Sequence, residues 1–114
     1  MAVQNNIRAI PLTTFNAAGL LAGFQAVNGP NGLDEPCIIL RINNASNVTI
    51  TISYDGVTDH EYLTANEVMQ IEAQTNSQPS NYVCNFKKGT IVYVRGIAGV
   101  GTIALSGYYS PKGV

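Results

Sequence analysis

The sequence has few of the side chains that carry catalysis or bind metals. Its 114 residues contain no tryptophan, two cysteines and a single histidine, His60, so one chain cannot form a site that needs two histidines. Asp55, Asp59 and Glu61 lie near His60 in the sequence and could bind a cation or act as acid and base. Beside a tight turn, however, such polar residues are expected for turn formation alone. We therefore predict no metal and no cofactor.

Charged residues are also scarce. Six basic and seven acidic residues make up only 11% of the chain, whereas a soluble domain usually carries about a quarter charged residues. Neutral threonine, serine, asparagine and glutamine take their place. We expect a partner to cover part of this weakly charged surface, most simply further copies in a homo-oligomer. The alternative is a neutral, polar monomer.

The basic residues are too dispersed to bind nucleic acid. Sequence-independent binding to phosphates requires a cluster of basic side chains, but only two of these six are adjacent: Arg8, Arg41, Lys87, Lys88, Arg95 and Lys112. No apolar run is long enough to span a bilayer, and the start of the chain lacks the basic and apolar regions of a signal peptide. The sequence predicts a protein made and kept in a cytoplasm, without nucleic-acid or membrane contact.

The two cysteines, Cys37 and Cys84, lie far apart in the sequence, each among apolar or aromatic residues. They could be cross-strand neighbours joined by a disulfide. Because the chain shows no secretion signal, two reduced and buried thiols are the expected state.

The clearest structural pattern is a hairpin in the middle of the chain. From Val48 to Tyr54, apolar and hydroxyl side chains alternate, which is typical of a half-buried strand. Asp55-Gly56 follows, a dipeptide that tolerates the positive φ angles of a tight turn. We expect the chain to reverse there and return from Thr58 to Leu63.

The first third of the chain predicts three less regular strands. Ile7 to Thr14 contains Pro11, which cannot donate to a strand ladder and so indicates an edge strand or a bend. The next segment could form two helical turns after Asn16, but its glycines weaken a helix by roughly 1 kcal/mol each. We expect a short turn and then a strand from Leu20 to Val27. Cys37 to Ile42 is almost wholly apolar, as in a strand buried on both faces.

The last third predicts further strands. Glu67 to Ala73 alternates as a half-buried strand, Gln74 to Asn81 is a polar loop, and Tyr82 to Phe86 is extended. Ile91 to Ile97 and Thr102 to Ser110 are strands on either side of a glycine-rich reversal, so Lys88 to Tyr109 should form a second hairpin. The side chains expected to face inward are Val92, Val94, Ile97, Ile103, Leu105 and Gly107.

About eight short strands with no convincing helix indicate an all-β protein. We predict a single-domain antiparallel β-sandwich or jelly roll over residues 1–114, with residues 1–6 and 111–114 as loose arms.

Two features suggest where a partner could make contact. The loop from Asn28 to Pro36 holds two Asn-Gly pairs around a proline, and loops of this length are often contact sites. The chain also has six tyrosines, whose flat apolar rings carry a polar tip. A plain surface loop and ordinary strand propensity are the alternatives. The candidate contact residues are Asn28, Asn31, Asp34, Tyr108 and Tyr109.

No catalytic set is evident. The run G-I-A-G-V-G at 96–101 has the spacing of a dinucleotide-binding loop, but such a loop needs a helix after it, and here a strand is expected. Ser53 and Ser106 have no base nearby in the sequence. We predict that the protein is not an enzyme; a hydrolase or metal enzyme built on His60 is the least favoured interpretation.

Three stretches resemble a known class of proteins. They are R-I-N-N-A-S-N-V-T-I-T-I-S-Y-D-G-V-T-D-H-E-Y-L, K-K-G-T-I-V-Y-V-R-G and G-T-I-A-L-S-G-Y-Y. Together they are similar to small β-rich virion structural proteins of tailed bacteriophages, and the likeness covers Ile38 to Tyr109. The shared residues are mainly those of the turns, so no binding residues are carried over.

This resemblance implies a structural part of a virus particle that is assembled in the host cytoplasm. The expected role is a capsid decoration (cement) protein that oligomerises and binds the major capsid protein. A ring or adaptor protein of the neck or tail is the alternative within the virion. A carbohydrate-binding or adhesin module, using tyrosines and the loops at Asp34 and Asp55, is the alternative from another class.

Overall fold

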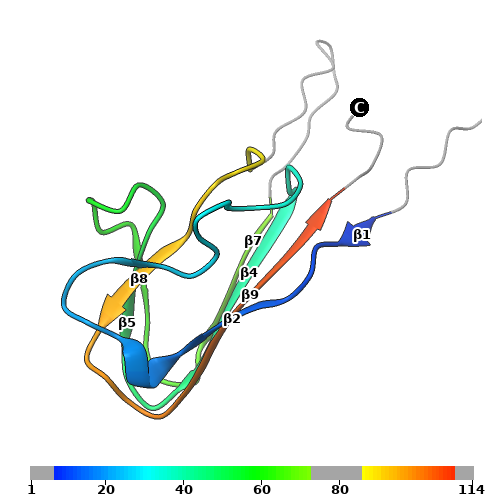
Figure 1. The fold of residues 1–114 in the computed structure, drawn as a ribbon. Helices are drawn as coiled ribbons and strands as arrows, with labels where there is room; N and C mark the ends of the chain where they lie inside the picture. The colour runs from blue at the N-terminus through cyan, green and yellow to red at the C-terminus, as the bar shows by residue number, and fades with distance from the viewer. Residues whose placement is uncertain (1–6, 73–85, 110–114) are drawn as a thin grey trace, which may run out of the picture.

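The computed structural model describes residues 7–72 and 86–109, which form two antiparallel β-sheets packed face to face (Figure 1). Sheet A has an edge made of β1 (Arg8–Ala9) and β2 (Thr13–Asn16), followed by β9 (Gly101–Tyr109), β4 (Ile39–Ser46) and β7 (Val68–Glu72). Sheet B has the order β3 (Gln25–Ala26), β8 (Tyr93–Gly96), β5 (Ile50–Ser53) and β6 (Glu61–Leu63). A 3-10 turn, η1 (Ala17–Gly19), follows β2.

The strand order is that of a jelly roll. With β1 and β2 counted as one interrupted strand, the described residues form eight strands. These pair as the nested antiparallel couples β1/β2 with β9, β3 with β8, β4 with β7 and β5 with β6. The chain is thus one long hairpin rolled into two sheets, with the β5–β6 loop at its tip. The predicted all-β sandwich or jelly roll is confirmed.

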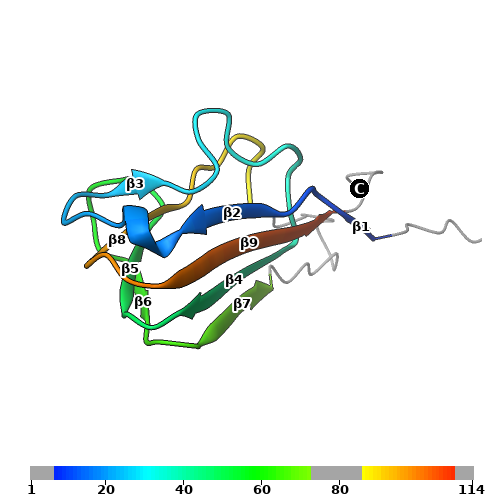
Figure 2. The same cartoon turned by 60° about the horizontal axis from the view of Figure 1, so that its bottom comes forward.

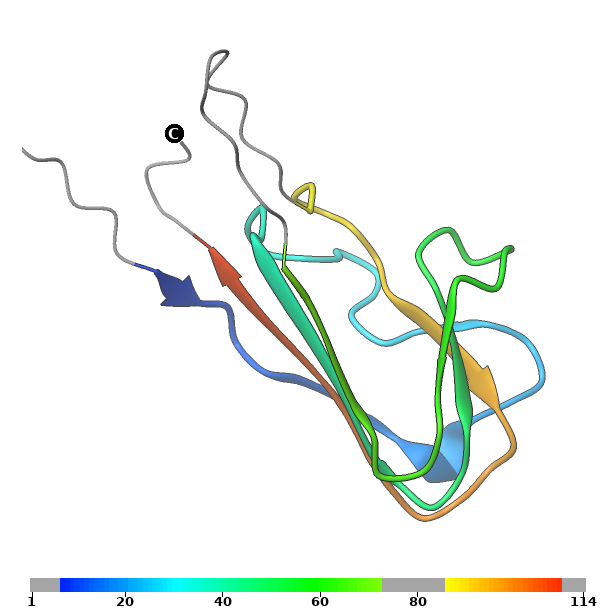
Figure 3. The same ribbon diagram turned by 180° about the vertical axis from the view of Figure 1, so that it is seen from behind.

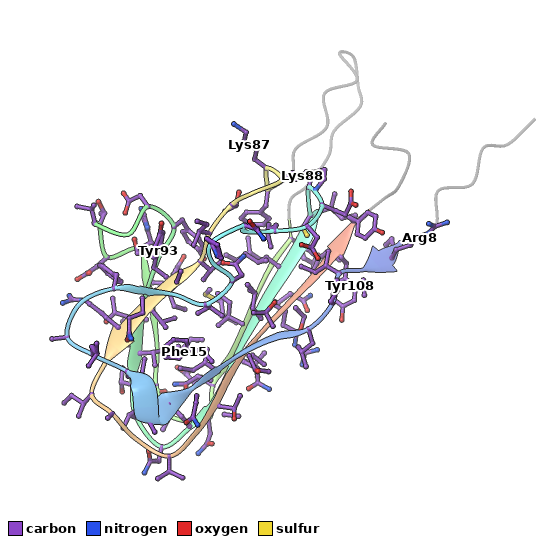
Figure 4. All side chains as sticks on the ribbon, viewed as in Figure 1. Arg8, Phe15, Lys87, Lys88, Tyr93 and Tyr108 are labelled. Atoms are coloured by element: carbon purple, nitrogen blue, oxygen red, sulfur yellow. The ribbon has the colours of Figure 1, made fainter. Side chains whose placement is uncertain are left out.

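The core lies between the sheets, which diverge from the end where the β4–β5, β6–β7 and β8–β9 connections pass (Figures 1 and 3). Alternate residues of the strands fill it, and Phe15 on β2 packs against it (Figure 4). Burial of such side chains is the main favourable term in folding. The buried apolar residues are Ile10, Ala17, Leu20, Val27, Leu33, Cys37, Leu40, Ile42, Ile50, Ile52, Leu63, Val92, Val94, Ile103 and Leu105.

The edge strand β1/β2 is interrupted at Pro11, as its sequence predicts. Ile10 N donates to Gly107 O at 2.9 Å, and Thr13 pairs with Leu105, so two residues, Pro11 and Leu12, lie opposite a single residue of β9. This is the arrangement of a β-bulge, where a residue without an N–H is tolerated.

The second predicted hairpin, Lys88 to Tyr109, is wrong. β8 pairs with β3 and β5 in sheet B, while β9 pairs with β4 and the β1/β2 edge in sheet A. The glycine-rich segment between them therefore crosses from one sheet to the other (Figure 2). Val94 and Ile103 are each 0% exposed, because the two apolar faces pack together as opposite walls of the core. As β8 ends at Gly96, Ile97 is 80% exposed and does not face inward as predicted.

Two other predicted strands differ in the structure. β4 begins at Ile39 rather than Cys37, and it is buried on one face only, with Arg41 exposed, because no other layer covers that side of sheet A among the described residues. The predicted strand Leu20–Val27 is reduced to the two residues of β3. The Gln25 side chain accepts from Leu21 N and donates to Gly19 O, both at 2.9 Å, which holds the preceding residues as a loop.

The predicted central hairpin is present, since Ile50 pairs with Leu63 and Ile52 with Glu61. Its connection is wider than a tight turn and runs from Tyr54 to His60. Gly56 has φ +79°, the positive value expected from its sequence. Residues 74–81 and 82–85, predicted as a loop and an extended segment, lie outside the described residues, as do both predicted arms. Phe86 forms a bridge with Cys37.

Candidate functional site: an exposed surface centred on Arg95

The outer face of sheet B carries a row of side chains that ends in an aromatic ring on each side. Tyr62 on β6 pairs with Thr51 on β5, and Thr51 pairs with Arg95 on β8. Phe24 directly precedes β3, whose Gln25 pairs with Val94, so Phe24 continues the row next to Arg95. Side chains of paired residues lie on the same face of a sheet. We call Phe24, Thr51, Asp59, Tyr62 and Arg95 the Arg95 surface.

Arg95 is the centre of this surface. Its guanidinium carbon lies 5.1 Å from the centre of the Phe24 ring, a cation–π geometry. Its Nη2 donates to both carboxylate oxygens of Asp59, at 3.0 and 2.8 Å. The side chains are 39% and 55% exposed, so water screens the ion pair and it adds little to folding stability. Arg95 Nε is buried without a hydrogen-bond partner among the described residues.

Three shallow hollows adjoin the Arg95 surface. The largest, about 720 Å³, lies between the loop before β3 and the β5–β6 loop, with Phe24, Asp59 and Arg95 in its wall. The second, about 300 Å³, has Thr51 and Tyr62 in its wall, and the third, about 250 Å³, lies beside Thr51 and Arg95. Because neighbouring hollows share these residues, they form one continuous uneven surface rather than separate pockets.

Large apolar side chains are exposed around the same surface. Val57 is 82% exposed, Ile97 80% and Tyr62 69%, and each lines one of the three hollows. Single exposed apolar residues are ordinary, but several around a stacked arginine resemble the composition of protein interfaces, where tyrosine and arginine are enriched.

Asp55 and His60 hold the backbone of the β5–β6 loop. Asp55 Oδ1 accepts hydrogen bonds from Thr58 N, Val57 N and Ser53 Oγ, each at 2.8 Å. The backbone donors Thr58 and Val57, followed by Ser53, hold the pKa of the Asp55 carboxyl well below its usual range. His60 Nδ1 accepts from Tyr54 N at 3.0 Å.

Three side chains of the His60 region make contacts within the fold. Asp55 and His60 are used by the loop, and Asp59 is paired with Arg95. Within residues 7–72 and 86–109, no three histidine, cysteine or acidic side chains form a group that could hold a metal. In the same residues the helical structure is limited to η1, and no helix is long and apolar enough to span a bilayer.

Asn28, in the predicted contact loop, is part of the strand pairing. Asn28 Nδ2 donates to Thr90 O at 3.1 Å, and its Oδ1 accepts from Val92 N at 2.9 Å, so its amide extends the β3–β8 pairing. Asn31 and Asp34 are exposed. Contact between these loop residues and a partner stays a prediction.

The two predicted tyrosines lie on opposite faces of β9. Tyr108 pairs with Ile39 and Ala9 and lies on the outer face of sheet A (Figure 4). Tyr109 packs against the core. Neither belongs to the Arg95 surface, so the structure does not bring the predicted contact residues together with it.

Cys37 is a fully buried thiol. Its Sγ lies 3.4 Å from Glu35 O, and burial, with smaller effects from the charges of Glu35 and Asp34, raises its pKa to about 11. This agrees with the prediction that Cys37 is buried. Cys84 lies outside the described residues, so its pairing stays a prediction.

Sequence reasoning did not find the Arg95 surface. The only available signal was that Arg95 alternates with the inward-facing Val92 and Val94, which places it on an outer face. Its neighbours could not be identified, because Phe24 and Asp59 are distant in sequence and meet Arg95 only through the strand order. Comparison of the chain with known protein families, curated proteins and solved structures finds no match.

Proposed function

We propose that the protein is a non-enzymatic structural component of a bacteriophage particle, and that it is a decoration protein bound to the major capsid protein. A ring or adaptor position at the neck or tail is the alternative within the particle. The resemblance of residues 38–109 to small virion proteins supports this proposal, and so does the jelly-roll architecture, which is widely used in viral capsid proteins.

The observation that carries the proposal is the Arg95 surface. It combines a stacked arginine with two aromatic rings, and exposed aliphatic side chains and shallow hollows surround it. This arrangement suits a protein partner better than a small substrate. We propose that this surface contacts the particle. The low charge of the chain fits a surface that a partner covers.

The test is the copy number of the protein in purified particles. Hundreds of copies would support decoration, about a dozen or fewer would move the protein to the neck or tail, where rings are small, and absence would refute the proposal. Particles assembled with the Arg95→Ala protein should then contain less of it. Arg41→Ala removes an exposed arginine from the other sheet, and it should leave incorporation unchanged.

A second candidate function is carbohydrate binding, since jelly rolls also form lectin domains. The largest hollow favours it, because an aromatic ring, a guanidinium and a carboxylate lie together there, as Phe24, Arg95 and Asp59. Such groups can stack on a sugar ring and bond its hydroxyls. Binding of the purified protein to a glycan array, lost in Phe24→Ala and kept in Tyr108→Ala, would favour this function over the first.

A further inference from the structure

Of the four sheet edges that the described residues form, one is longer and more regular than the others. The β1/β2 edge is broken at Pro11, β3 has two residues and β6 has three. β7 runs for five residues, V-M-Q-I-E, without proline, glycine or lysine (Figure 2). Proline, lysine and short length are the usual features that keep edge strands from pairing. β7 has none of them.

The outward backbone groups of β7 can be identified from its pairing with β4. Asn44 N donates to Glu67 O at 2.8 Å, and hydrogen-bonded pairs alternate along an antiparallel ladder. Met69 and Ile71 therefore bond to β4, while the N–H and C=O groups of Val68, Gln70 and Glu72 point away from the sheet. In the part of the chain that the structure describes, no backbone group pairs with these six.

The side chains of β7 are suited to a further strand. Met69 and Ile71 lie on the inner face and are only partly buried, and Met69 packs against the core. Val68, on the outer face, is 48% exposed. A strand added at this edge would cover the open sides of these three apolar side chains.

We propose that β7 pairs with β7 of a second copy of this chain, antiparallel and about a two-fold axis at Gln70. Gln70 then lies opposite Gln70 of the partner subunit, and Val68 lies opposite the partner's Glu72. All six outward backbone groups of each strand find partners in this register. Met69 meets the partner's Ile71 on the inner face, so the two cores become continuous and the two A sheets become one.

Charge is compatible with this register and with a second copy as the occupant. The two Glu72 side chains are each opposite a valine rather than each other, so like charges are not paired across the axis. Gln70, which faces itself, is neutral and donates to Glu72 Oε2 at 2.8 Å. Five residues per strand bury little area, so we expect a weak, concentration-dependent dimer. This dimer does not depend on the proposed virion role.

A charge-pair experiment tests both the edge and the register. Because residue 70 faces itself, Gln70→Lys and Gln70→Glu should each weaken self-association by roughly fivefold through like-charge repulsion. An equimolar mixture of the two variants should form heterodimers at least as well as the wild type dimerises. Sedimentation over a concentration series gives the dissociation constants, and circular dichroism checks that both variants fold.

The matched control is the same pair of substitutions at Thr14, an exposed residue on the opposite edge of sheet A. These should change neither self-association nor mixing. A second readout is amide hydrogen exchange, in which Val68, Gln70 and Glu72 should gain protection with concentration while Met69 and Ile71 are protected throughout. A wild type that stays monomeric at about 1 mM, a dimer insensitive to Gln70 charges, or no recovery in the mixture would overturn the proposal. None of these results bears on the copy number in particles.

Discussion

The side-chain amide of Asn44 on β4 donates a hydrogen bond to the main-chain carbonyl of Leu63 at the end of β6, at 3.2 Å, and so links the two sheets. The same Nδ2 donates to Val48 O and Thr64 O, both at 2.9 Å, and Oδ1 accepts from Ser46 Oγ. Asn44 is 0% exposed. One buried amide therefore binds the connections β4–β5 and β6–β7 where the chain passes between the sheets.

Replacing Asn44 should destabilise the fold strongly. In Asn44→Ala the buried carbonyls lose their donor, and we expect the free energy of unfolding to fall by about 3 kcal/mol. Asn44→Asp should lower the free energy of unfolding further, because a carboxylate has no hydrogen-bond donor and brings a charge into the core. Urea unfolding measures both. Asn43→Ala, on the outer face next to it, should stay within about 0.5 kcal/mol of the wild type; an equal loss there would contradict this role of Asn44.

Sequence patterns predicted the elements better than their partners. Alternation identified the inward residues Val92, Val94, Ile103 and Leu105 because period-two patterning depends on burial alone. It could not show that the strands holding them belong to different sheets, since an inter-sheet crossing and a hairpin have the same local pattern. The positive φ of Gly56 was predicted because it is a local requirement, but the tight turn was wrong, since the connection runs from Tyr54 to His60.

Long-range contacts explain what local patterns could not predict. Asn28 and Gln25 looked like loop and strand residues, yet their side chains substitute for backbone partners. No sequence pattern marked Asn44 as buried. The Arg95 surface likewise depends on three strands and two loops that meet only in the folded sheet.

Glycine at position 32 is required by both its conformation and its neighbours. Gly32 has φ +77°, and a Cβ there would clash with the main-chain carbonyl of Gly89. Gly32→Ala should lower the free energy of unfolding by about 3 kcal/mol. A Cβ at Gly23 would meet no atom within 4 Å, so Gly23→Ala is the matched control. Thermal unfolding should separate the two variants clearly; equal melting temperatures would show that the loop yields around the added methyl.

The Tyr54 hydroxyl should be dispensable for stability. It is buried with no hydrogen-bond partner among the described residues, so we expect Tyr54→Phe to be neutral or stabilising by up to about 1 kcal/mol. Burial, together with the nearby charge of Glu61, raises the pKa of Tyr54 to about 12.

The same substitution should change the response to alkali. An unfolded tyrosine ionises near pH 10, so between about pH 10 and 12 the unfolded chain loses a proton that the folded chain keeps, and wild-type stability falls as pH rises. Tyr54→Phe lacks this contribution, so its stability should drop less between about pH 8 and pH 11. Tyr62→Phe, on an exposed ring, should behave like the wild type. An equal alkaline drop in Tyr54→Phe would contradict the raised pKa.

Asp55 should make the protein less stable in acid. Because the pKa of Asp55 is lowered in the folded chain, its carboxyl stays ionised at pH values where the unfolded chain takes up a proton. The resulting stabilisation is present above the unfolded pKa of about 4 and is lost as pH falls through the folded pKa. Asp55→Asn keeps an acceptor oxygen for Val57 N and Thr58 N but cannot titrate. Its stability should therefore depend less on pH below about 4 than that of the wild type, as measured by urea unfolding. Glu67, whose pKa is lowered by hydrogen bonds from Thr64, contributes in the same range, so the comparison is best made in a Glu67→Gln background. If Asp55→Asn leaves the acid dependence of the Glu67→Gln protein unchanged, the Asp55 carboxylate does not stabilise the β5–β6 loop as its hydrogen bonds indicate.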